Sequence, residues 1–189
     1  MPELPEVEAV RQSLDKKIKQ KIVKKVIVKN RNLRFKVKNN FESFFKNQKI
    51  KRIERFSKYL ILFLSNNFIC LIHLGMSGTI HLIDKRKTNY QTNTSFYSFP
   101  MLPKKHNHIE FIFDDFRLVY NDPRRFGFFE ILKNINEFKK RFKKFGPEPF
   151  NSEFNLKYIY YYLKGKKKKY KKLFIRSEFC FWNRQYLCK

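Results

Sequence analysis

The chain has 189 residues, of which 42% are hydrophobic, enough for one well-buried domain and the start of a second. This composition excludes a globally disordered chain, and no apolar run approaches the roughly 20 residues that a membrane-spanning helix needs. The net charge of +27 predicts attraction to a polyanion such as nucleic acid, but an A/T-rich coding sequence would also enrich lysine. Charge alone leaves both explanations open.

The first regular element is a helix predicted over residues 5–18. The apolar residues with helical spacing are Val7, Val10, Leu14 and Ile18. Pro5 suits the first turn of this helix, where a missing N–H costs nothing. Glu6 is expected either to cap the helix or to line a binding pocket. The segment MPELPEVEAV is acidic where an export signal would be basic, so we expect a cytoplasmic protein.

From residue 21 the pattern changes to that of β-strands. Short segments rich in β-branched and aromatic residues predict strands over 21–30, 50–56, 59–65, 68–74, 108–115, 116–122 and 127–132. A short helix is predicted over 41–48, between two of these segments. Together they indicate a β-sandwich or flattened barrel of about eight strands.

After residue 133 the pattern becomes helical again. An amphipathic helix is predicted over 134–146, ended by Gly146, and a second helix over 154–165 precedes the basic run KKKKYKK. The expected fold class is therefore α+β. An N-terminal helix and β-sandwich occupy residues 1–133, and a linker with the beginning of a helical domain occupies 134–179.

The residues that carry the most chemical information stand at the start of the chain. Removal of Met1 would leave Pro2 as a secondary amine, which is a nucleophile toward aldehyde-like carbons and forms an iminium. Glu3 lies beside that amine and could donate a proton to a sugar oxygen. Met-Pro-Glu alone is a common start, so these three residues carry little weight without further motifs.

Further motifs follow in one consistent order. They are PELPEVE at 2–8, RFSKYLIL at 55–62, IHLGMSG at 72–78, KHNHIEF at 105–111, NDPRRFG at 121–127 and FGPEPF at 145–150. In sequence and order this set resembles the formamidopyrimidine-DNA glycosylases, a family of base-excision repair enzymes. The related endonuclease VIII group typically has Gly where this chain has Leu4, so the resemblance favours the branch that removes oxidised purines.

The resemblance implies three catalytic residues. Pro2 would attack the sugar C1′ and expel a purine such as 8-oxoguanine or a formamidopyrimidine. Glu3 would supply the acid that helps to open the deoxyribose ring. Lys58 would bind backbone phosphate and assist proton transfer during strand cleavage; its alternative is a solvated lysine on a strand, the usual place for a basic residue.

The resemblance also implies side chains that enter the DNA. An enzyme that excises a stacked base must flip it out of the duplex, and another group must fill the gap. Met76, Arg124 and Phe126 match the family's three space-filling side chains, and apolar wedges flanked by basic residues are a known way to kink DNA. Without the resemblance, Met76 and Phe126 would be read as core residues.

Further DNA contacts are implied at His73, His106, Arg124 and one of Lys166 and Lys167, between which the lysine run does not discriminate. For each histidine a structural role within a strand is the alternative. His73 would face a backbone phosphate, a contact that positions the duplex and does not read its sequence.

The end of the chain departs from the family pattern. Longer members continue with a helix–two-turns–helix module and a zinc finger, and this chain has no counterpart of their zinc cysteines. Its cysteines, Cys70, Cys180 and Cys188, form no CxxC pair, so we expect no metal, cofactor or disulfide. After Phe179 the family pattern would be similar to VSGIGNIYAN, but this chain has CFWNRQYLCK. When CFWNRQYLCK is back-translated with A/T-rich codons and shifted by one base, it encodes VSGIGNIYA. We therefore hypothesise that residues 180–189 are an out-of-frame tail.

Three functions remain to be weighed. The first is a bifunctional DNA glycosylase and apurinic-site lyase that acts as a monomer on damaged double-stranded DNA. The second is an inactive, truncated remnant that binds DNA weakly and without specificity. The third, a basic nucleic-acid-binding β-domain without catalytic ancestry, is disfavoured by the ordered motifs.

Overall fold

The computed structural model describes residues 2–84, 104–148, 151–166 and 178–180. The chain divides into two compact units, Met1–Ile135 and Asn136–Lys189. Residues 181–189 of the hypothesised out-of-frame tail lie outside the described part of the chain. Within that part, no helix is both long and apolar enough to cross a membrane.

The first unit begins with helix α1, Leu4–Ile18, which confirms the predicted N-terminal helix. Glu3 and Glu6 form a capping box, in which the Glu3 backbone N–H donates to Glu6 Oε2 at 2.9 Å, so Glu6 has the predicted capping role. The predicted apolar stripe is the buried face of the helix. Its four residues join the hydrophobic core of the unit.

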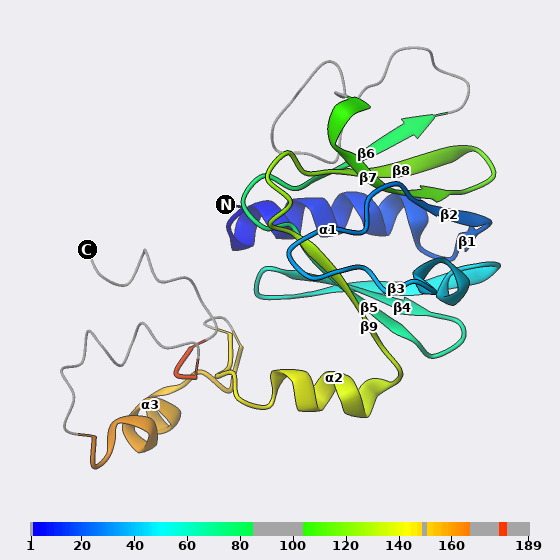
Figure 1. Cartoon of the computed structure of the whole chain (residues 1–189). Coiled ribbons are helices and arrows are strands. Elements are labelled where there is room, and N and C mark those ends of the chain that lie inside the picture. Colours follow the sequence, from blue (N-terminus) through cyan, green and yellow to red (C-terminus); the bar gives the residue numbers. More distant parts are fainter. Residues whose placement is uncertain (1, 85–103, 149–150, 167–177, 181–189) are drawn as a thin grey trace. The chain divides into compact units, whose positions relative to one another are not determined.

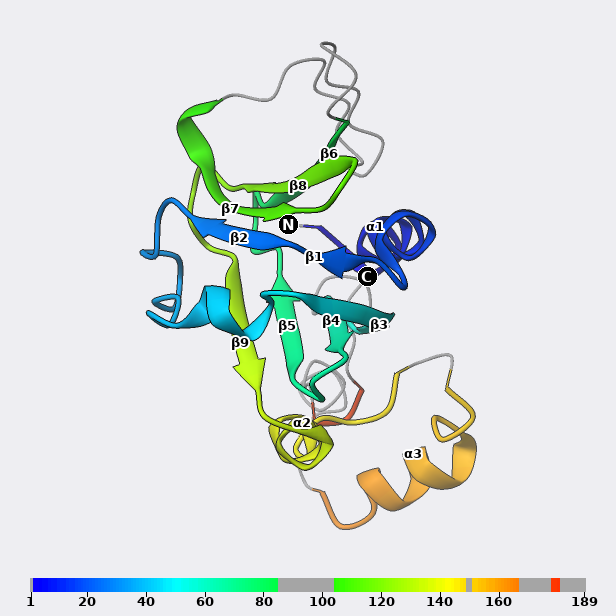
Figure 2. The ribbon, with the colours of Figure 1, turned by 90° about the vertical axis from the view of Figure 1, so that its right-hand side faces the viewer.

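Two antiparallel sheets follow in the described residues. The five-stranded sheet has the order β1-β3-β4-β5-β9, with β1 at Ile22–Val23, β3 at Gln48–Phe56, β4 at Tyr59–Leu64, β5 at Ile69–His73 and β9 at Phe128–Leu132. The four-stranded sheet has the order β2-β7-β8-β6, with β2 at Lys25–Val28, β7 at Asn107–Ile112, β8 at Phe116–Asn121 and β6 at Thr79–Asp84. Figures 1 and 2 show α1 alongside the space between the two sheets, where its buried face meets the core.

The predicted sandwich is confirmed, with three differences in its elements. Strand β6, Thr79–Asp84, was not predicted, although it contains two isoleucines and a threonine. The predicted strand over 21–30 is two strands, β1 and β2, which belong to different sheets because the chain crosses between them at Lys24. The predicted helix over 41–48 is the shorter 3-10 turn η1, Phe41–Phe44.

The described part of the second unit contains two helices, which begin within the segments predicted to be helical. Helix α2, Ile135–Phe142, starts at the unit boundary and ends before Gly146. Helix α3, Leu156–Leu163, begins at Asn155, whose side chain accepts a hydrogen bond from the Tyr158 N–H at 3.0 Å. An aromatic cluster stabilises α3 and consists of Phe154, Tyr158, Tyr162 and Phe179.

Candidate functional site

The site is formed by two loops, each of which connects one sheet with the other. The loop over 74–78 joins β5 to β6, and the loop over 122–127 joins β8 to β9. The register pairs His73 with Phe128 in one sheet and Thr79 with Asn121 in the other. Because both loops run between the same two paired strand ends, the motifs IHLGMSG and NDPRRFG become neighbours.

The two loops touch through their backbones at Gly75. This residue has a φ of 68°, in the left-handed region, and a Cβ there would lie 2.4 Å from Gly127 N and from Phe126 C. No other residue type fits such an approach without moving the backbone. Gly75 therefore permits the contact that sets the loops side by side.

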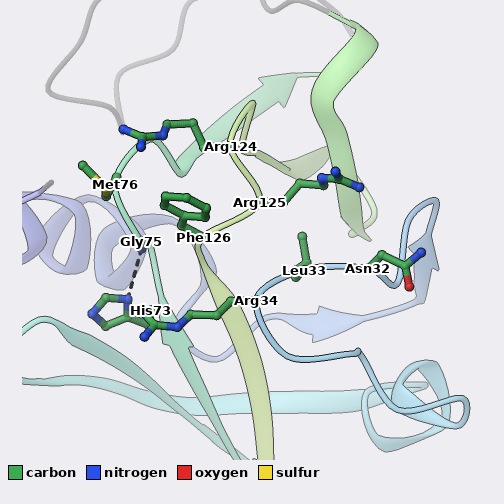
Figure 3. A pocket seen from close by; sticks show the side chains of 9 residues that line it. All are labelled: Asn32, Leu33, Arg34, His73, Gly75, Met76, Arg124, Arg125 and Phe126. Carbon is green, nitrogen blue, oxygen red and sulfur yellow. Dashed lines mark hydrogen bonds between the residues drawn. The ribbon is translucent and has the colours of Figure 1, made fainter.

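A cleft of about 760 Å³ opens over these loops. Its lining residues are Asn32, Leu33, Arg34, His73, Gly75, Met76, Arg124, Arg125 and Phe126 (Figure 3). Met76 is 45% exposed and Phe126 is 41% exposed, so neither belongs to the core, which was the alternative explanation for both. The guanidinium carbon of Arg124 lies 4.7 Å from the centroid of the Phe126 ring, a cation–π contact. The three predicted space-filling residues thus share one cleft.

Lys58 lies in the turn between β3 and β4, not on a strand. It is buried, which rules out the alternative of a solvated lysine, and its Nζ is 2.7 Å from Glu3 Oε2. Tyr59, the next residue, pairs with His73 of β5. The turn that carries Lys58 therefore lies at the same end of the sheet as the start of the 74–78 loop.

A second ion pair ties α1 to the turn that carries Lys58. Arg55 Nε donates to Glu8 Oε2 at 2.9 Å, and Arg55 Nη1 donates to the Ser57 carbonyl at 3.0 Å. Burial alone would raise the pKa of Glu8, but hydrogen bonds from Arg11, Arg55 and Gln12 outweigh it and lower the pKa below its usual value. The charged Glu8 thus holds the start of α1, with the half-buried Pro2 and Glu3, against this turn.

His73 is a neutral residue in the wall of the cleft. Burial, helped by the charges of Arg34 and Lys58, lowers its pKa to about 4. Its Nδ1 accepts a hydrogen bond from the Gly75 N–H at 3.1 Å, drawn in Figure 3, so the proton of the neutral ring resides on Nε2. The ring is stacked on Phe128, with centroids 5.4 Å apart. His73 can therefore donate one hydrogen bond to an anion, but brings no positive charge.

The other predicted contacts fall in two places. His106 ends the 3-10 turn η2, Lys104–His106, and its carbonyl accepts a hydrogen bond from the Asp122 N–H at 3.0 Å, which ties it to the 122–127 loop. Lys166 belongs to the second unit, where its Nζ lies 3.0 Å from the centroid of the Tyr162 ring. Lys167 lies outside the described residues.

Sequence reasoning did not single out several polar residues of the cleft and its floor. Arg34 and Arg125 line the cleft, and Arg125 has a φ of 57°, uncommon for a residue with a side chain. Ser77 and Asp122 lie beneath it and are joined by a hydrogen bond. An Asp followed by Pro is a turn signal that could have singled out Asp122, whereas Arg34 differs in no visible way from the other basic residues.

The described residues include no cluster of three or more His, Cys, Asp and Glu side chains suited to hold a metal ion. Cys70 is buried, and burial raises the pKa of its thiol, so this cysteine is not a reactive thiolate.

Comparison with known proteins identifies relatives of the chain. A sequence profile described as the formamidopyrimidine-DNA glycosylase N-terminal domain matches residues 1–129. The formamidopyrimidine-DNA glycosylase of Wolbachia sp. subsp. Brugia malayi is 39% identical over 168 residues, which cover 88% of this chain and 56% of the relative. The corresponding protein of Psychromonas ingrahamii is 37% identical over 160 residues, which cover 85% of this chain and 54% of the relative. The chain therefore spans about half the length of these relatives.

Solved structures similar to this chain include formamidopyrimidine-DNA glycosylases bound to DNA. The Lactococcus lactis formamidopyrimidine-DNA glycosylase, non-covalently bound to DNA that contains an AP site, matches with a TM-score of 0.76 and 27% identity. That match covers 94% of this chain and 64% of the other. A T221P mutant of the Lactococcus protein in complex with DNA containing Fapy-dG matches with a TM-score of 0.77 and 27% identity, covering 95% of this chain and 61% of the other.

Proposed function

Because the chain belongs to the formamidopyrimidine-DNA glycosylase family, we propose that it excises oxidised purines from double-stranded DNA and then cleaves the resulting apurinic site. The observation that carries the proposal is the ion pair between the buried Lys58 and Glu3, the residue that follows Pro2. An acid, a base and a potential amine nucleophile thus meet at the edge of the β-sandwich.

The proposed reaction begins with the amine of Pro2, freed by removal of Met1. Its lone pair attacks the sugar C1′, the C1′–N bond to the purine breaks, and the base leaves with a proton. Lys58 Nζ and Glu3 Oε2 lie 2.7 Å apart and share a proton. This proton can pass to the ring oxygen O4′ as the sugar opens. Pro2 and C1′ are then joined as an iminium.

The iminium makes strand cleavage possible, because it acidifies the neighbouring C2′. Loss of a C2′ proton forms a double bond to C3′, and the 3′ phosphate leaves with the electron pair of the C3′–O bond. We assign to Lys58 the binding of backbone phosphate and the relay of this proton. Water finally hydrolyses the iminium, which releases the sugar aldehyde and restores the Pro2 amine.

The cleft supplies what base flipping requires. Unstacking a base costs a few kcal/mol, which groups inserted into the gap offset. Met76 and Phe126 are exposed and apolar, and Arg124 stacks on Phe126 with its hydrogen-bonding groups available to the orphaned base. His73 and His106 are proposed as contacts to the DNA backbone, with Lys166 or Lys167 from the second unit. The proposed reaction uses no cofactor, and we propose that the chain acts as a monomer.

The proposal is tested by trapping the iminium. Purified chain is incubated with duplex DNA that contains an abasic site, or 8-oxoguanine opposite cytosine, and is reduced with borohydride. The expected result is a covalent protein–DNA adduct. The matched control carries one extra glycine between Met1 and Pro2, which turns the proline nitrogen into an unreactive amide and is expected to abolish the adduct.

Three other outcomes would contradict the proposal. An adduct that survives in the glycine-extended control would assign the nucleophile to another amine. No adduct, at protein concentrations that saturate the abasic duplex, would favour a chain that binds DNA without turnover. Equal affinity for intact and abasic duplex would favour a basic nucleic-acid-binding domain without repair function.

A further inference from the structure

We infer that Asp122, together with Ser77, is a positioning residue. It fixes the 74–78 loop, which carries Met76, and the 122–127 loop, which carries Phe126, so that both side chains can enter DNA at a flipped base. This inference deepens the proposed function and rests on it. Neither residue faces the reacting sugar in the proposed chemistry; each acts through the side chains that the two loops present.

The contacts of the Asp122 carboxylate span both loops. Oδ1 accepts a hydrogen bond from Ser77 Oγ, which lies next to Met76 in the first loop. Oδ2 accepts from the Gly127 N–H at 2.9 Å, next to Phe126 in the second loop. One side chain thus connects the residues that neighbour both exposed apolar groups.

Two more donors complete the arrangement. Tyr120 Oη donates to Oδ2 at 2.9 Å, and the Arg124 N–H lies 3.3 Å from both Oδ1 and Ser77 Oγ. The backbone of Asp122 extends the network to a third segment, because its N–H donates to the His106 carbonyl at 3.0 Å. Segments with the predicted contacts His106, Met76, Arg124 and Phe126 therefore meet at one residue.

The chemistry of this residue suits a carboxylate in particular. Asp122 is fully buried and has no ion pair with a basic side chain among the described residues. A buried carboxylate is costly unless each oxygen is hydrogen-bonded, and here hydroxyl and backbone N–H groups do this. Every described partner of its oxygens is a donor, so an amide in its place would turn an NH₂ group toward other donors.

The wedge side chains themselves have little packing to hold them. Met76 and Phe126 are nearly half exposed, so their direction depends on the backbone beneath them. A loop that is already fixed in its bound geometry loses less conformational freedom on binding. The Asp122 network therefore lowers the cost of inserting both groups into the duplex.

The test uses Ser77→Ala, which removes the hydroxyl that joins the loops and leaves Asp122 in place. Binding is measured to duplexes with and without a tetrahydrofuran abasic analogue, with 2-aminopurine beside the analogue to report unstacking. We expect the abasic preference to fall about three- to tenfold, the effect of losing one hydrogen bond to a charged group, and the fluorescence rise to shrink. Affinity for intact duplex should change by less than twofold.

The matched control is Ser65→Ala. Ser65 lies in the β4–β5 turn, and its hydroxyl also makes hydrogen bonds, with the Lys49 N–H and Gln48 Oε1, so the same chemical change is made away from the cleft. This variant should keep the preference and the fluorescence change of the natural chain. Ser77→Thr, which retains the hydroxyl, should restore most of the loss.

A double-mutant cycle separates positioning from general destabilisation. If Ser77 acts through Met76, then Ser77→Ala should add less than twofold to the loss of preference caused by Met76→Ala. Fully additive losses, or an unchanged preference in Ser77→Ala, would overturn the inference. Asp122→Asn should give a larger loss than Ser77→Ala, with thermal melting recorded to confirm that the variant is folded.

Failure of the inference can be told apart from failure of the proposed function. If the natural chain shows no preference for the abasic duplex and forms no borohydride adduct, the proposed function is wrong. If the natural chain shows both and Ser77→Ala behaves like Ser65→Ala, only the positioning role is wrong.

Discussion

The two functional regions of the first unit are built in opposite ways. At the start of α1 the charged groups are partly or fully buried and paired, with the buried Lys58 against Glu3 and with Glu8 held by Arg55. In the cleft the apolar groups are exposed, and the charge that organises them, Asp122, is buried beneath. The first arrangement suits proton transfer, which needs charged groups held in a fixed geometry. The second suits insertion between bases.

For the proposed function, this difference predicts that binding of the damaged site and the reaction at that site can be impaired by separate substitutions. A change at the start of α1 should affect reaction rates more than binding, and a change in the cleft should affect damage selectivity more than the reaction of an already exposed abasic site. Substitutions in the two regions test that separation, and the largest effect is expected at Lys58.

Lys58→Met should reduce strand cleavage at an abasic site by about 100-fold, because a general acid or base contributes on the order of 10²–10⁴ in rate. Binding to the uncleavable tetrahydrofuran duplex should fall by less than about fivefold, the cost of one phosphate contact. Gel assays of cleavage and a binding titration measure the two quantities. Lys49→Met, an exposed lysine on β3, is the control. Equal losses in rate and affinity would contradict the separation.

Phe126→Ala should lower the preference for abasic over intact duplex by about tenfold, since an aromatic wedge that replaces lost stacking is removed. The borohydride adduct with single-stranded abasic DNA, which needs no wedge, should fall much less. Phe35→Ala is the control, because Phe35 is 55% exposed yet does not line the cleft. An effect on single-stranded DNA as large as that on the duplex would show that Phe126 serves the chemistry as well.

Arg34→Ala should weaken binding to intact and abasic duplex equally. Arg34 lines the cleft and has no ion pair among the described residues, so its charge is available to a phosphate. Loss of one phosphate contact should reduce the slope of log K against log salt concentration by about 0.9. Salt titrations measure this slope, with the exposed Lys46→Ala as the control. An unchanged slope would place Arg34 away from the DNA backbone.

The smallest expected effect is on the titration of His73. Its pKa is lowered to about 4 by burial first and then by the charges of Arg34 and Lys58. Arg34→Ala should therefore raise this pKa toward 6.5, as followed by NMR of the imidazole ring. His81, whose pKa is lowered to about 4 by burial alone, is an internal control and should not respond.

The same histidine predicts a pH dependence of stability. Between pH 6.5 and 4, His73 is protonated in the unfolded chain and neutral in the folded chain. The free energy of unfolding therefore falls as the pH drops through this window. Above pH 6.5 this contribution is fully present. Replacement of His73 by Gln should flatten the pH dependence measured by denaturant unfolding between pH 4 and 6.5.

The sequence by itself determined the features that depend on neighbouring residues. The helical period of the first 18 residues predicted α1 with its buried face, and short segments rich in β-branched and aromatic residues predicted most strands of the sandwich. The ordered motifs identified the family. These signals are local, because the residues that define a helix or a strand lie within one short segment of the chain.

The tertiary structure decided which of those residues meet. The pairing of His73 with Phe128 and of Thr79 with Asn121 joins segments that are more than 40 residues apart, so no local pattern could show that the two cleft loops are adjacent. The same packing places Asp122 between donors from both loops and buries His73, which lowers its pKa. Burial and hydrogen-bond partners are properties of the packed core, and side-chain chemistry alone does not specify them.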